Sequence, residues 1–270
     1  MVVQHNLTAM NANRQLSGVT SAQAKSTEKL SSGYRINRAA DDAAGLSISE
    51  KLRSQIRGLD KAASNSQDGI SLVQVAEGAL NETHSILQRM NELATQAAND
   101  TNTSTDRASI QKEMDQLTSE IDRIRSTTQF NSMNLLDGTF KNMKLQVGAL
   151  SGQSIAISID NMNASSLKIS GLKVSSFSSA GKAMAAIQKA INSVSVQRSK
   201  LGAIQNRLEH TINNLNTTSE NTSAAESRIR DVDMATEMVE YSKNNILAQA
   251  GQSMLAQANQ ATQGVLSLLQ

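Results

Sequence analysis

The chain has 270 residues and contains no proline. Average usage would supply roughly 13 prolines in a chain of this length. Proline interrupts helix interiors because its ring fixes φ and its nitrogen carries no proton. A chain without proline can continue a helix over many turns, so we expect long, uninterrupted helices to dominate the fold.

The apolar residues are mostly small or aliphatic. Aromatic residues amount to two Tyr and three Phe, and Trp and Cys are absent. A compact globule of this length would normally bury several large rings, whereas Ala, Leu, Ile, Val and Met suit narrow seams between helices. The composition therefore predicts a mainly α fold, an elongated antiparallel helical bundle or coiled coil.

Charge and hydropathy exclude several classes of protein. The 26 basic and 24 acidic residues give a net charge of +2 without a block of like charge, so no nucleic-acid partner is expected. No apolar run is long enough for a membrane span, so no membrane insertion is expected. The N-terminus MVVQHNLTAM lacks the basic and apolar regions of a Sec signal peptide. Without Cys there is no disulfide and no thiolate metal site.

Apolar residues recur at steps of three and four over most of the chain, which is the spacing of one helix face. Gly33 suits the left-handed position after a helix, and Ser104 or Thr105 is expected to cap the third helix. The Asn-, Thr- and Ser-rich stretch 214–224 weakens the helical prediction there. Helices are therefore predicted at 1–33, 43–98, about 104–128 and from about 179 onward, with a connector at 34–42.

Residues 139–175 change to a period of two. Ile155, Ile157 and Ile159 alternate with smaller or polar residues, and the pairs Leu145/Val147 and Leu167/Ile169 do the same. We expect two or three short strands here, as a small β-hairpin region and the only β structure in the chain. The helix at 43–98 then packs antiparallel on the helix at 180–225, with residue 84 opposite about residue 184.

Chemistry-bearing side chains form no catalytic or metal-binding pattern. The histidines are His5, His84 and His210, without an HExxH motif. In the predicted pairing His84 and His210 lie roughly 40 Å apart. Asp233 and Glu237 belong to an acidic face, which is explained by helix N-terminal charge and ion pairs. We expect no enzyme activity, no metal and no cofactor.

Three segments of the N-terminal half and three of the C-terminal half resemble bacterial flagellins. They cover most of 1–140 and 180–270. The N-terminal segments are LSSGYRINRAADDAAGLSIS (30–49), NSQDGISLVQVAEGALNETHSILQRMNELATQAAND (65–100) and EIDRIRSTTQFNSMNLLDG (120–138). The C-terminal segments are LGAIQNRLEHTINNL (201–215), AESRIRDVDMATE (225–237) and ILAQAGQSMLAQANQ with VLSLL (246–269).

The resemblance implies a structural subunit that polymerises into the flagellar filament. It implies a layered subunit, in which both chain ends form an inner tube beneath a helical rod domain. The variable outer domains are absent, because only about 40 residues join the two halves. The implied divisions are 1–42 for the N-terminal inner-tube helix and connector, 43–178 for the first part of the rod with the β region 139–175, 179–228 for its C-terminal helix, and 229–270 for the C-terminal inner-tube helix.

Two positions depart from the family pattern. Ala261 and Thr262 stand where many members have a proline, which favours an uninterrupted last helix. Asn91 stands where many members have Arg. Neither departure removes a residue on which filament formation is expected to depend.

The terminal helices have no other long apolar surface within the chain, so we expect them to need each other or a neighbouring subunit. The predicted polymerisation residues are Leu7, Met10, Leu16, Val19, Ile246, Ala250, Met254, Val265 and Leu268. The resemblance also implies an extracellular flagellar location, export by the flagellar type III route, a chaperone on about 230–270, and contacts with hook–filament junction and cap proteins.

The resemblance further implies recognition of the monomer by a Toll-like innate immune receptor. Arg89, Leu93 and Glu113 match the family's contact positions. Arg89 and Leu93 are four residues apart, so they share a helix face, and Glu113 is expected on the neighbouring antiparallel helix.

Two alternative identities share parts of this pattern. A hook–filament junction protein is similar at the termini, but the full C-terminal segments favour the filament subunit. A cytoplasmic, chemoreceptor-like signalling protein also has Ala-, Ser- and Gln-rich helices folded into a hairpin. A signalling protein of that kind has no evident need for a β region at the turn between its two helices.

Overall fold

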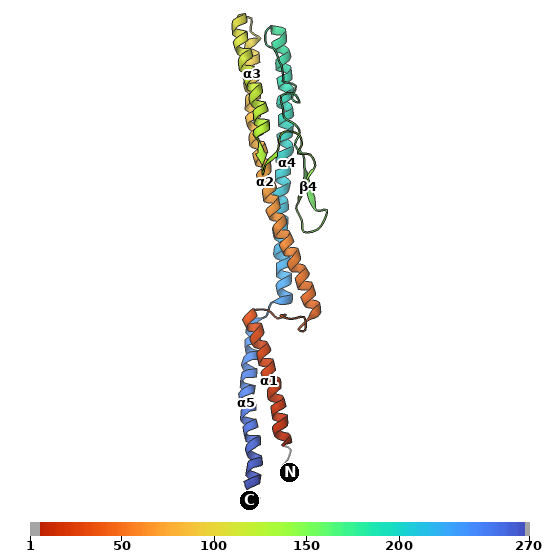
Figure 1. Cartoon of the computed structure of the whole chain (residues 1–270), viewed down its shortest axis with the longest axis vertical. Helices are drawn as coiled ribbons and strands as arrows, with labels where there is room; N and C mark the ends of the chain where they lie inside the picture. Colours follow the sequence, from red (N-terminus) through yellow and green to blue (C-terminus); the bar gives the residue numbers. More distant parts are fainter. Residues whose placement is uncertain (1–5, 268–270) are drawn as a thin grey trace. The chain divides into compact units, whose positions relative to one another are not determined.

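The computed structural model describes residues 6–267, with side chains through Ala261. The chain forms two compact units: unit 2 is Ile56–Glu220, and unit 1 is made by the residues on either side of it. The elements are shown in Figure 1. They are α1 (Leu7–Ser32), α2 (Ala43–Ala97), α3 (Ser104–Thr127), β1 (Gln129–Phe130), β2 (Met133–Asn134), β3 (Met143–Gln146), β4 (Ser154–Ile157), α4 (Phe177–Arg230) and α5 (Met234–Ser267).

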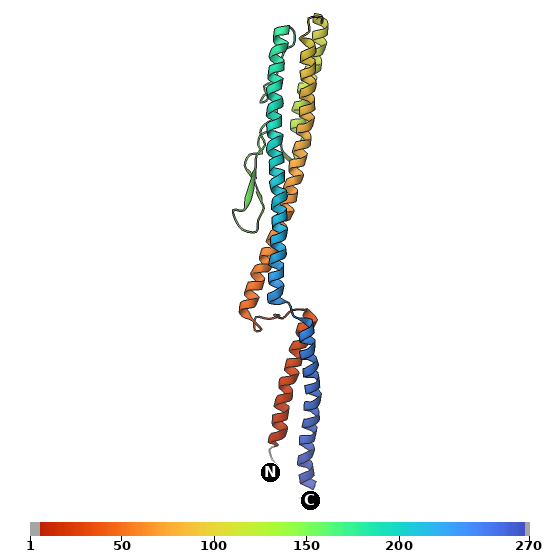
Figure 2. The same cartoon turned by 180° about the vertical axis from the view of Figure 1, so that it is seen from behind.

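The prediction of a mainly α fold with long antiparallel helices is confirmed. In unit 2 both views show α2 and α4 side by side, with α3 returning along α2 (Figures 1 and 2). In unit 1, α1 and α5 run antiparallel to one another. Gly33 follows α1 in the left-handed conformation at φ 76°, and its N–H donates to the Lys29 carbonyl, as the sequence indicated.

The predicted cap of α3 was wrong by one residue. Thr103 is the cap, and its hydroxyl accepts from the Asp106 N–H while the Asp106 carboxylate accepts from the Thr103 N–H. This reciprocal capping box satisfies two backbone donors that the first turn would otherwise leave free. Ser104 is the first residue of the helix.

The helix weakness expected at 214–224 is absent, because α4 continues through the stretch. Leu215 is buried within it. The hydroxyls of Thr217 and Thr218 donate to carbonyls four residues back, and Ser219 donates to Asp60 of α2 at 2.8 Å. Packing and hydrogen bonds therefore outweigh the low helix propensity of these residues.

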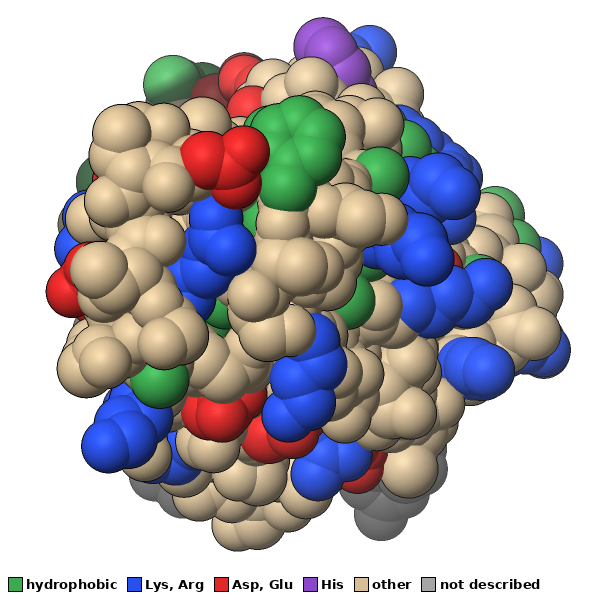
Figure 3. All heavy atoms as spheres, turned by 90° about the horizontal axis from the view of Figure 1, so that it is seen from above, with side chains coloured by type: hydrophobic (Ala, Val, Ile, Leu, Met, Phe, Trp, Pro, Cys, Tyr) green, Lys and Arg blue, Asp and Glu red, His purple; other side chains and the backbone are tan. Residues whose placement is uncertain are grey.

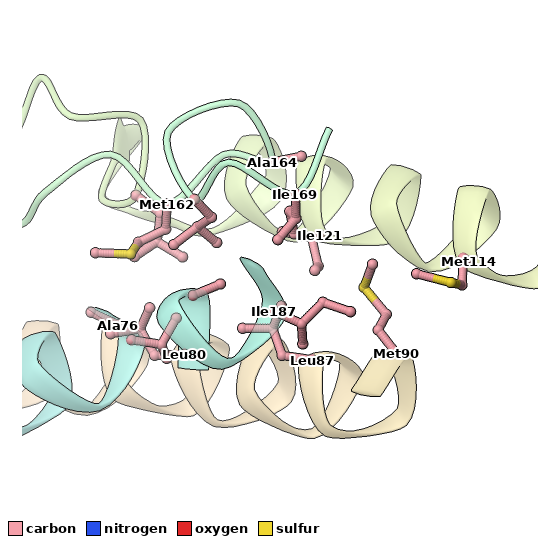
Figure 4. Close-up of a cluster of buried hydrophobic side chains, with 14 of the residues drawn as sticks. Ala76, Leu80, Leu87, Met90, Met114, Ile121, Met162, Ala164, Ile169 and Ile187 are labelled. Carbon is pink, nitrogen blue, oxygen red and sulfur yellow. The ribbon is translucent and has the colours of Figure 1, made fainter. Parts of the chain in front are cut away.

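The core of unit 2 lies where α2, α3, α4 and the segment before α4 meet. Figure 4 shows Leu87 of α2 beside Ile187 of α4, with Ile121 of α3 and Ile169 above them and Leu80 further along α2. All five side chains are at most 1% exposed. Burying an aliphatic side chain of this size contributes about 1.5–3 kcal/mol. This cluster therefore holds the three helices together.

The β structure is partly as predicted. β3 pairs with β4 antiparallel inside 139–175, but β1 and β2 form a further hairpin before it, so the expectation of a single β region was wrong. Its turn residues Asn131 and Ser132 have φ of 48° and 62°, as a two-residue hairpin turn requires. Leu167 and Ile169 belong to no described strand and are buried in the irregular segment before α4 instead.

The register of α2 against α4 differs from the predicted one. Glu77 forms an ion pair with Arg198 at 3.5 Å, and Asp60 pairs with Ser219. These contacts place residue 84 opposite about residues 191–195 rather than 184. His84 and His210 are then roughly 25 Å apart along the helices, less than predicted but still far beyond a shared ligand.

Candidate functional site

The inner face of the terminal helix pair follows a heptad on both helices. Its side chains are at least half-buried and repeat at alternating steps of three and four, the spacing of a coiled-coil seam. On α1 they are Ala9, Ala12, Leu16, Val19, Gln23, Ser26 and Leu30. On α5 they are Glu237, Tyr241, Asn244, Ala248, Gly251, Leu255 and Ala258.

Small residues allow these two helices to approach closely, with Cα atoms within 8 Å of one another. A Cβ on Gly251 would lie 3.2 Å from Cδ1 of Leu16, so the leucine packs directly on the glycine backbone. The Asn6 side chain, which caps α1, also donates to the Ala258 carbonyl at 2.9 Å. Lys29 forms an ion pair with Glu237 at 3.3 Å near the other end. Leu16 and Val19, two predicted polymerisation residues, therefore face the seam within the chain.

A second apolar face points away from the seam. Leu7 and Met10 of α1 are 69% and 63% exposed, and Ile246 and Met254 of α5 are 67% and 62% exposed. Ala250 is exposed on the same helix. Within the part of the chain that the structure describes, these five predicted polymerisation residues remain exposed. The side chains of Val265 and Leu268 lie outside those that the structure describes.

Further apolar side chains extend this outward face on α5. Val239 is 70% exposed and Met238 is 49% exposed, and both line a shallow groove with Ile246 and Lys243. A second groove lies between the helices and is lined by Thr8, Ala12, Met254, Gln257, Ala258 and Ala261. Exposed apolar side chains that gather on one helix face are typical of interaction sites.

The connectors beside the helix pair are joined by a clasp, which we define as Gly33–Arg35 with Arg230–Val232. Tyr34 and Asp231 form an antiparallel bridge, in which the Arg35 N–H donates to the Arg230 carbonyl at 2.7 Å and the Val232 N–H donates to the Gly33 carbonyl at 3.0 Å. The Arg35 guanidinium also donates to the Ile229 carbonyl. The clasp thus joins the chain before α2 to the chain after α4.

Arg230 is the central side chain of the clasp. It lies over the Tyr34 ring and donates to Glu50 of α2 at 2.9 Å. This hydrogen bond is the main reason that the pKa of Glu50 is held below its ordinary value. The clasp residues form no pattern from which their contact could be predicted. The sequence feature that could have indicated the clasp is Tyr34, which is one of only five aromatic residues and lies in a predicted connector.

The predicted receptor residues lie on α2 and α3 of unit 2. Arg89 of α2 donates through Nε and Nη2 to one Glu113 oxygen of α3, at 3.1 and 3.0 Å, and through Nη1 to Glu92. These bonds raise the pKa of the guanidinium, Glu113 contributing most. Arg89 and Glu113 are exposed, whereas Leu93 is 2% exposed and belongs to the core. Leu93 therefore supports the helix face beneath Arg89 in this conformation.

Asp233 illustrates a charged group that is explained by local hydrogen bonds. Asp233 accepts from the Ala235 N–H and the Thr236 hydroxyl, which lowers its pKa and caps α5. Within the described residues, no cluster of three or more His, Asp or Glu side chains is arranged to hold a metal. Lys, Arg, Asp and Glu side chains are interspersed on the face seen in Figure 3. None of the described helices is long and apolar enough to cross a membrane.

The comparisons with known proteins cover both halves of the chain. Residues 3–141 match the family model described as the bacterial flagellin N-terminal helical region, and residues 184–269 match that of the bacterial flagellin C-terminal helical region. The chain is 56% identical over 271 residues to a flagellin of Halalkalibacterium halodurans and 53% identical over 304 residues to a flagellin of Bacillus subtilis. All of this chain and all of each relative are covered.

Solved structures show the same fold. The crystal structure of Bacillus cereus flagellin matches with a TM-score of 0.50 and 34% identity, covering 60% of this chain and 94% of that one. A putative flagellar hook-associated protein from Vibrio parahaemolyticus matches with a TM-score of 0.59 over 71% of this chain and all of that one. Its identity of 15% supports a common fold alone.

Proposed function

The chain belongs to the bacterial flagellin family, the subunits of the flagellar filament, and we propose that the outward apolar faces of its α1 and α5 join neighbouring subunits. As a flagellin it is an extracellular structural protein of motility and not an enzyme. The observation that carries the proposal is the exposure of Leu7, Met10, Ile246 and Met254 opposite a seam that already pairs the helices.

Exposed apolar area explains why the faces favour polymerisation. Each large aliphatic side chain removed from water contributes about 1.5–3 kcal/mol, and a helical polymer repeats every contact along its length. The outward face of α5 runs from Val239 to Met254, so one helix presents several such side chains to a neighbour. In this proposal 1–42 and 229–270 form the inner tube, while 43–178 and 179–228 form the rod.

Deletion of 233–270 tests the assembly role. The truncated chain is expected to lose polymerisation from seeds while unit 2 keeps its helical circular dichroism, because the core of that unit lies within Ile56–Glu220. Sedimentation with seeds gives the assembly result. Filaments of normal length from the truncated chain would contradict the proposal.

The same outward face supports a proposed export partner. Before assembly, exposed apolar side chains on α5 favour premature association, so a chaperone would cover about 230–270 during export by the flagellar type III route. Pull-down of the chaperone with the full chain and with 1–230 tests this, since only the full chain should retain it. Equal retention by both would count against the site. Hook–filament junction and cap proteins would contact the same surfaces at the filament ends.

A second proposed function is recognition of the monomer by a Toll-like receptor. The supporting observation is the exposed Arg89–Glu113 pair, which presents charged hydrogen-bonding groups from two adjacent helices. Charge-assisted hydrogen bonds to such groups are stronger than neutral ones. Packing of the buried Leu93 holds the part of α2 that carries Arg89 in place. Leu93 would then act from beneath the contact rather than within it.

Arg89→Ala tests this recognition. Arg89 and its partner Glu113 are exposed, and exposed ion pairs contribute little to stability, so the substitution should leave the fold intact. It should weaken binding of the monomer to the receptor ectodomain by at least roughly 10-fold if Arg89 is a hot spot. Arg123→Ala is the matched control, because Arg123 is also exposed and pairs with a glutamate, Glu120. Equal affinity of the Arg89 variant and the natural chain would overturn the site.

A further inference from the structure

The methionines that the structure describes differ widely in exposure. Those of the unit 2 core, Met90 and Met114 among them, are at most 4% exposed. Met10, Met238 and Met254 of the terminal helices are 63%, 49% and 62% exposed. Because the chain contains neither Cys nor Trp, these exposed thioethers are the side chains that a peroxide oxidises most readily.

The exposed methionines of the terminal helices lie where the apolar surface is open. Met238 lines one groove on α5 together with Val239 and Ile246. Met254 lines the second groove, between α5 and α1. Met10 adds a thioether to the exposed face of α1. Each groove therefore presents a methionine to the partner that covers it.

The contacts that hold the terminal helices together use none of these methionines. The seam residues from Ala9 to Leu30 on α1 and from Glu237 to Ala258 on α5 include no methionine. The clasp contains none either. Oxidation confined to the exposed methionines therefore changes the outer surface of the helix pair and leaves its internal packing unchanged.

Oxidation by hydrogen peroxide makes the thioether polar. The sulfur lone pair attacks one peroxide oxygen and the O–O bond breaks. The released hydroxide then takes the proton from the sulfur-bound hydroxyl and leaves as water. Sulfur loses the two electrons that the peroxide gains, and the product is a polar sulfoxide. An exposed sulfoxide oxygen is hydrated by water, whereas burial in an apolar contact leaves it without a hydrogen-bond donor.

We propose that Met10, Met238 and Met254 form a reversible oxidation site through which peroxide controls the assembly of the free chain. The free chain exposes the three thioethers, and their sulfoxides weaken the contact of the outward faces with a neighbouring subunit. In a filament the same faces are covered, so assembled subunits resist the reaction. The proposal rests on the assembly role of the outward faces and adds the chemistry that regulates it.

Peptide mapping by mass spectrometry locates the reaction. In the monomer treated with hydrogen peroxide, Met10, Met238 and Met254 should form sulfoxide at least roughly 10-fold faster than the core methionines, because exposure controls access of the oxidant. In filaments grown from seeds, the same three positions should react at least roughly 10-fold more slowly than in the monomer. Equal rates at the exposed and the core methionines of the monomer would overturn the proposal.

Seeded elongation measures the effect of the sulfoxides. The oxidised chain should have a critical concentration at least roughly 10-fold above that of the untreated chain, because burial of an unpaired sulfoxide oxygen is unfavourable. Methionine sulfoxide reductases A and B, which act on the two sulfoxide epimers, should restore the untreated value. Circular dichroism should be the same before and after oxidation. An unchanged critical concentration, or loss of helix on oxidation, would contradict the proposal.

Leucine substitutions assign the effect to these side chains. The triple variant Met10→Leu, Met238→Leu and Met254→Leu keeps the apolar volume but has no sulfur at the three positions. Each variant is compared with its own untreated sample, and peroxide should leave the critical concentration of this one unchanged. A response to peroxide that persists in the triple variant would show that other residues cause it.

The matched control removes three other exposed methionines. Met133 and Met143 lie in β2 and β3 of unit 2, and Met234 is the first residue of α5, before the outward face begins. The variant Met133→Leu, Met143→Leu and Met234→Leu should keep the roughly 10-fold response to peroxide, as expected if only the outward faces become buried. Loss of the response in this control would also overturn the proposal.

The variant Ile246→Ser separates the oxidation site from the assembly role. If this substitution raises the critical concentration and oxidation does not, the outward face assembles and the oxidation proposal alone fails. If neither changes the critical concentration, the assembly role of the face fails together with the oxidation site.

Discussion

The guanidinium of Arg230 lies over the ring of Tyr34, with Cζ 4.6 Å from the ring centroid. The same guanidinium donates to Glu50, and the Arg230 carbonyl accepts from Arg35. One residue at the end of α4 therefore contacts the connector before α2 and the first turns of α2. This arrangement makes Arg230 the natural point at which to test the clasp.

Removing the ring should loosen the clasp. Tyr34→Ala and Arg230→Ala, alone and combined, are expected to show a coupling free energy of about 0.5–1 kcal/mol, typical of an exposed cation–π contact. Hydrogen exchange of the Arg35 and Val232 amides measures local opening of the clasp. Tyr34→Phe keeps the ring and should exchange as the natural chain does. Additive effects of the two alanine substitutions would contradict the coupling.

Two glycines of α2 should respond oppositely to alanine. A Cβ on Gly78 would have nothing within 4 Å of it, so Gly78→Ala should stabilise unit 2 by about 1 kcal/mol through helix propensity. A Cβ on Gly69 would lie 2.3 Å from Cδ2 of Leu145 in β3, so the leucine must move, and Gly69→Ala should destabilise unit 2 by up to about 2 kcal/mol once the gain in helix propensity is subtracted. Urea unfolding followed by circular dichroism checks both, and stabilisation by Gly69→Ala would contradict the packing.

The outward face should control assembly without controlling folding. Ile246→Ser removes one large exposed apolar side chain and is expected to raise the critical concentration for elongation at least roughly 10-fold, from a loss of about 1.5–3 kcal/mol per contact. Gln252→Ser, an exposed polar position on the same helix, is the control. Sedimentation of seeded reactions gives both values. If the two variants had the same critical concentration, Ile246 would not be an assembly contact.

The capping box of α3 should titrate at acid pH. Hydrogen bonds from the Thr103 hydroxyl and N–H lower the pKa of Asp106 below its ordinary 3.8. A lowered pKa means that the cap stabilises the helix above the unfolded value and that this contribution is lost as pH falls through the folded one. Nuclear magnetic resonance titration of Asp106 should therefore show a higher pKa in Thr103→Val. An unchanged pKa would contradict the hydrogen bonds as its cause.

Local patterns alone identified most of the helices. Steps of three and four between apolar residues, together with the absence of proline, placed the start of α2 at residue 43, where the structure has it. Gly33 was assigned to a left-handed position, because few other residues adopt that conformation without strain. The β1–β2 hairpin was missed because its strands have two residues each and show no alternation.

Spacing along a helix does not distinguish the core from the surface. Arg89 and Leu93 are four residues apart and differ by about 40° around α2. That angle is enough to bury Leu93 at 2% exposure while Arg89 reaches Glu113 at the surface. Which of two neighbouring stripes becomes the core depends on where α3 and α4 pack, and no local pattern encodes that.

In the terminal helices too, the sequence determined some features and the tertiary structure determined others, for the same reason. The sequence by itself determined that both ends are amphipathic and helical, because apolar spacing and helix propensity are properties of each segment alone. It could not decide which face of α5 pairs with α1, since the stripe with Ile246 and the stripe with Ala248 have the same period. In the structure the stripe with Ala248 pairs with α1, because the small residues Ala248 and Gly251 allow α1 to approach closely. The larger side chains of the stripe with Ile246 remain exposed.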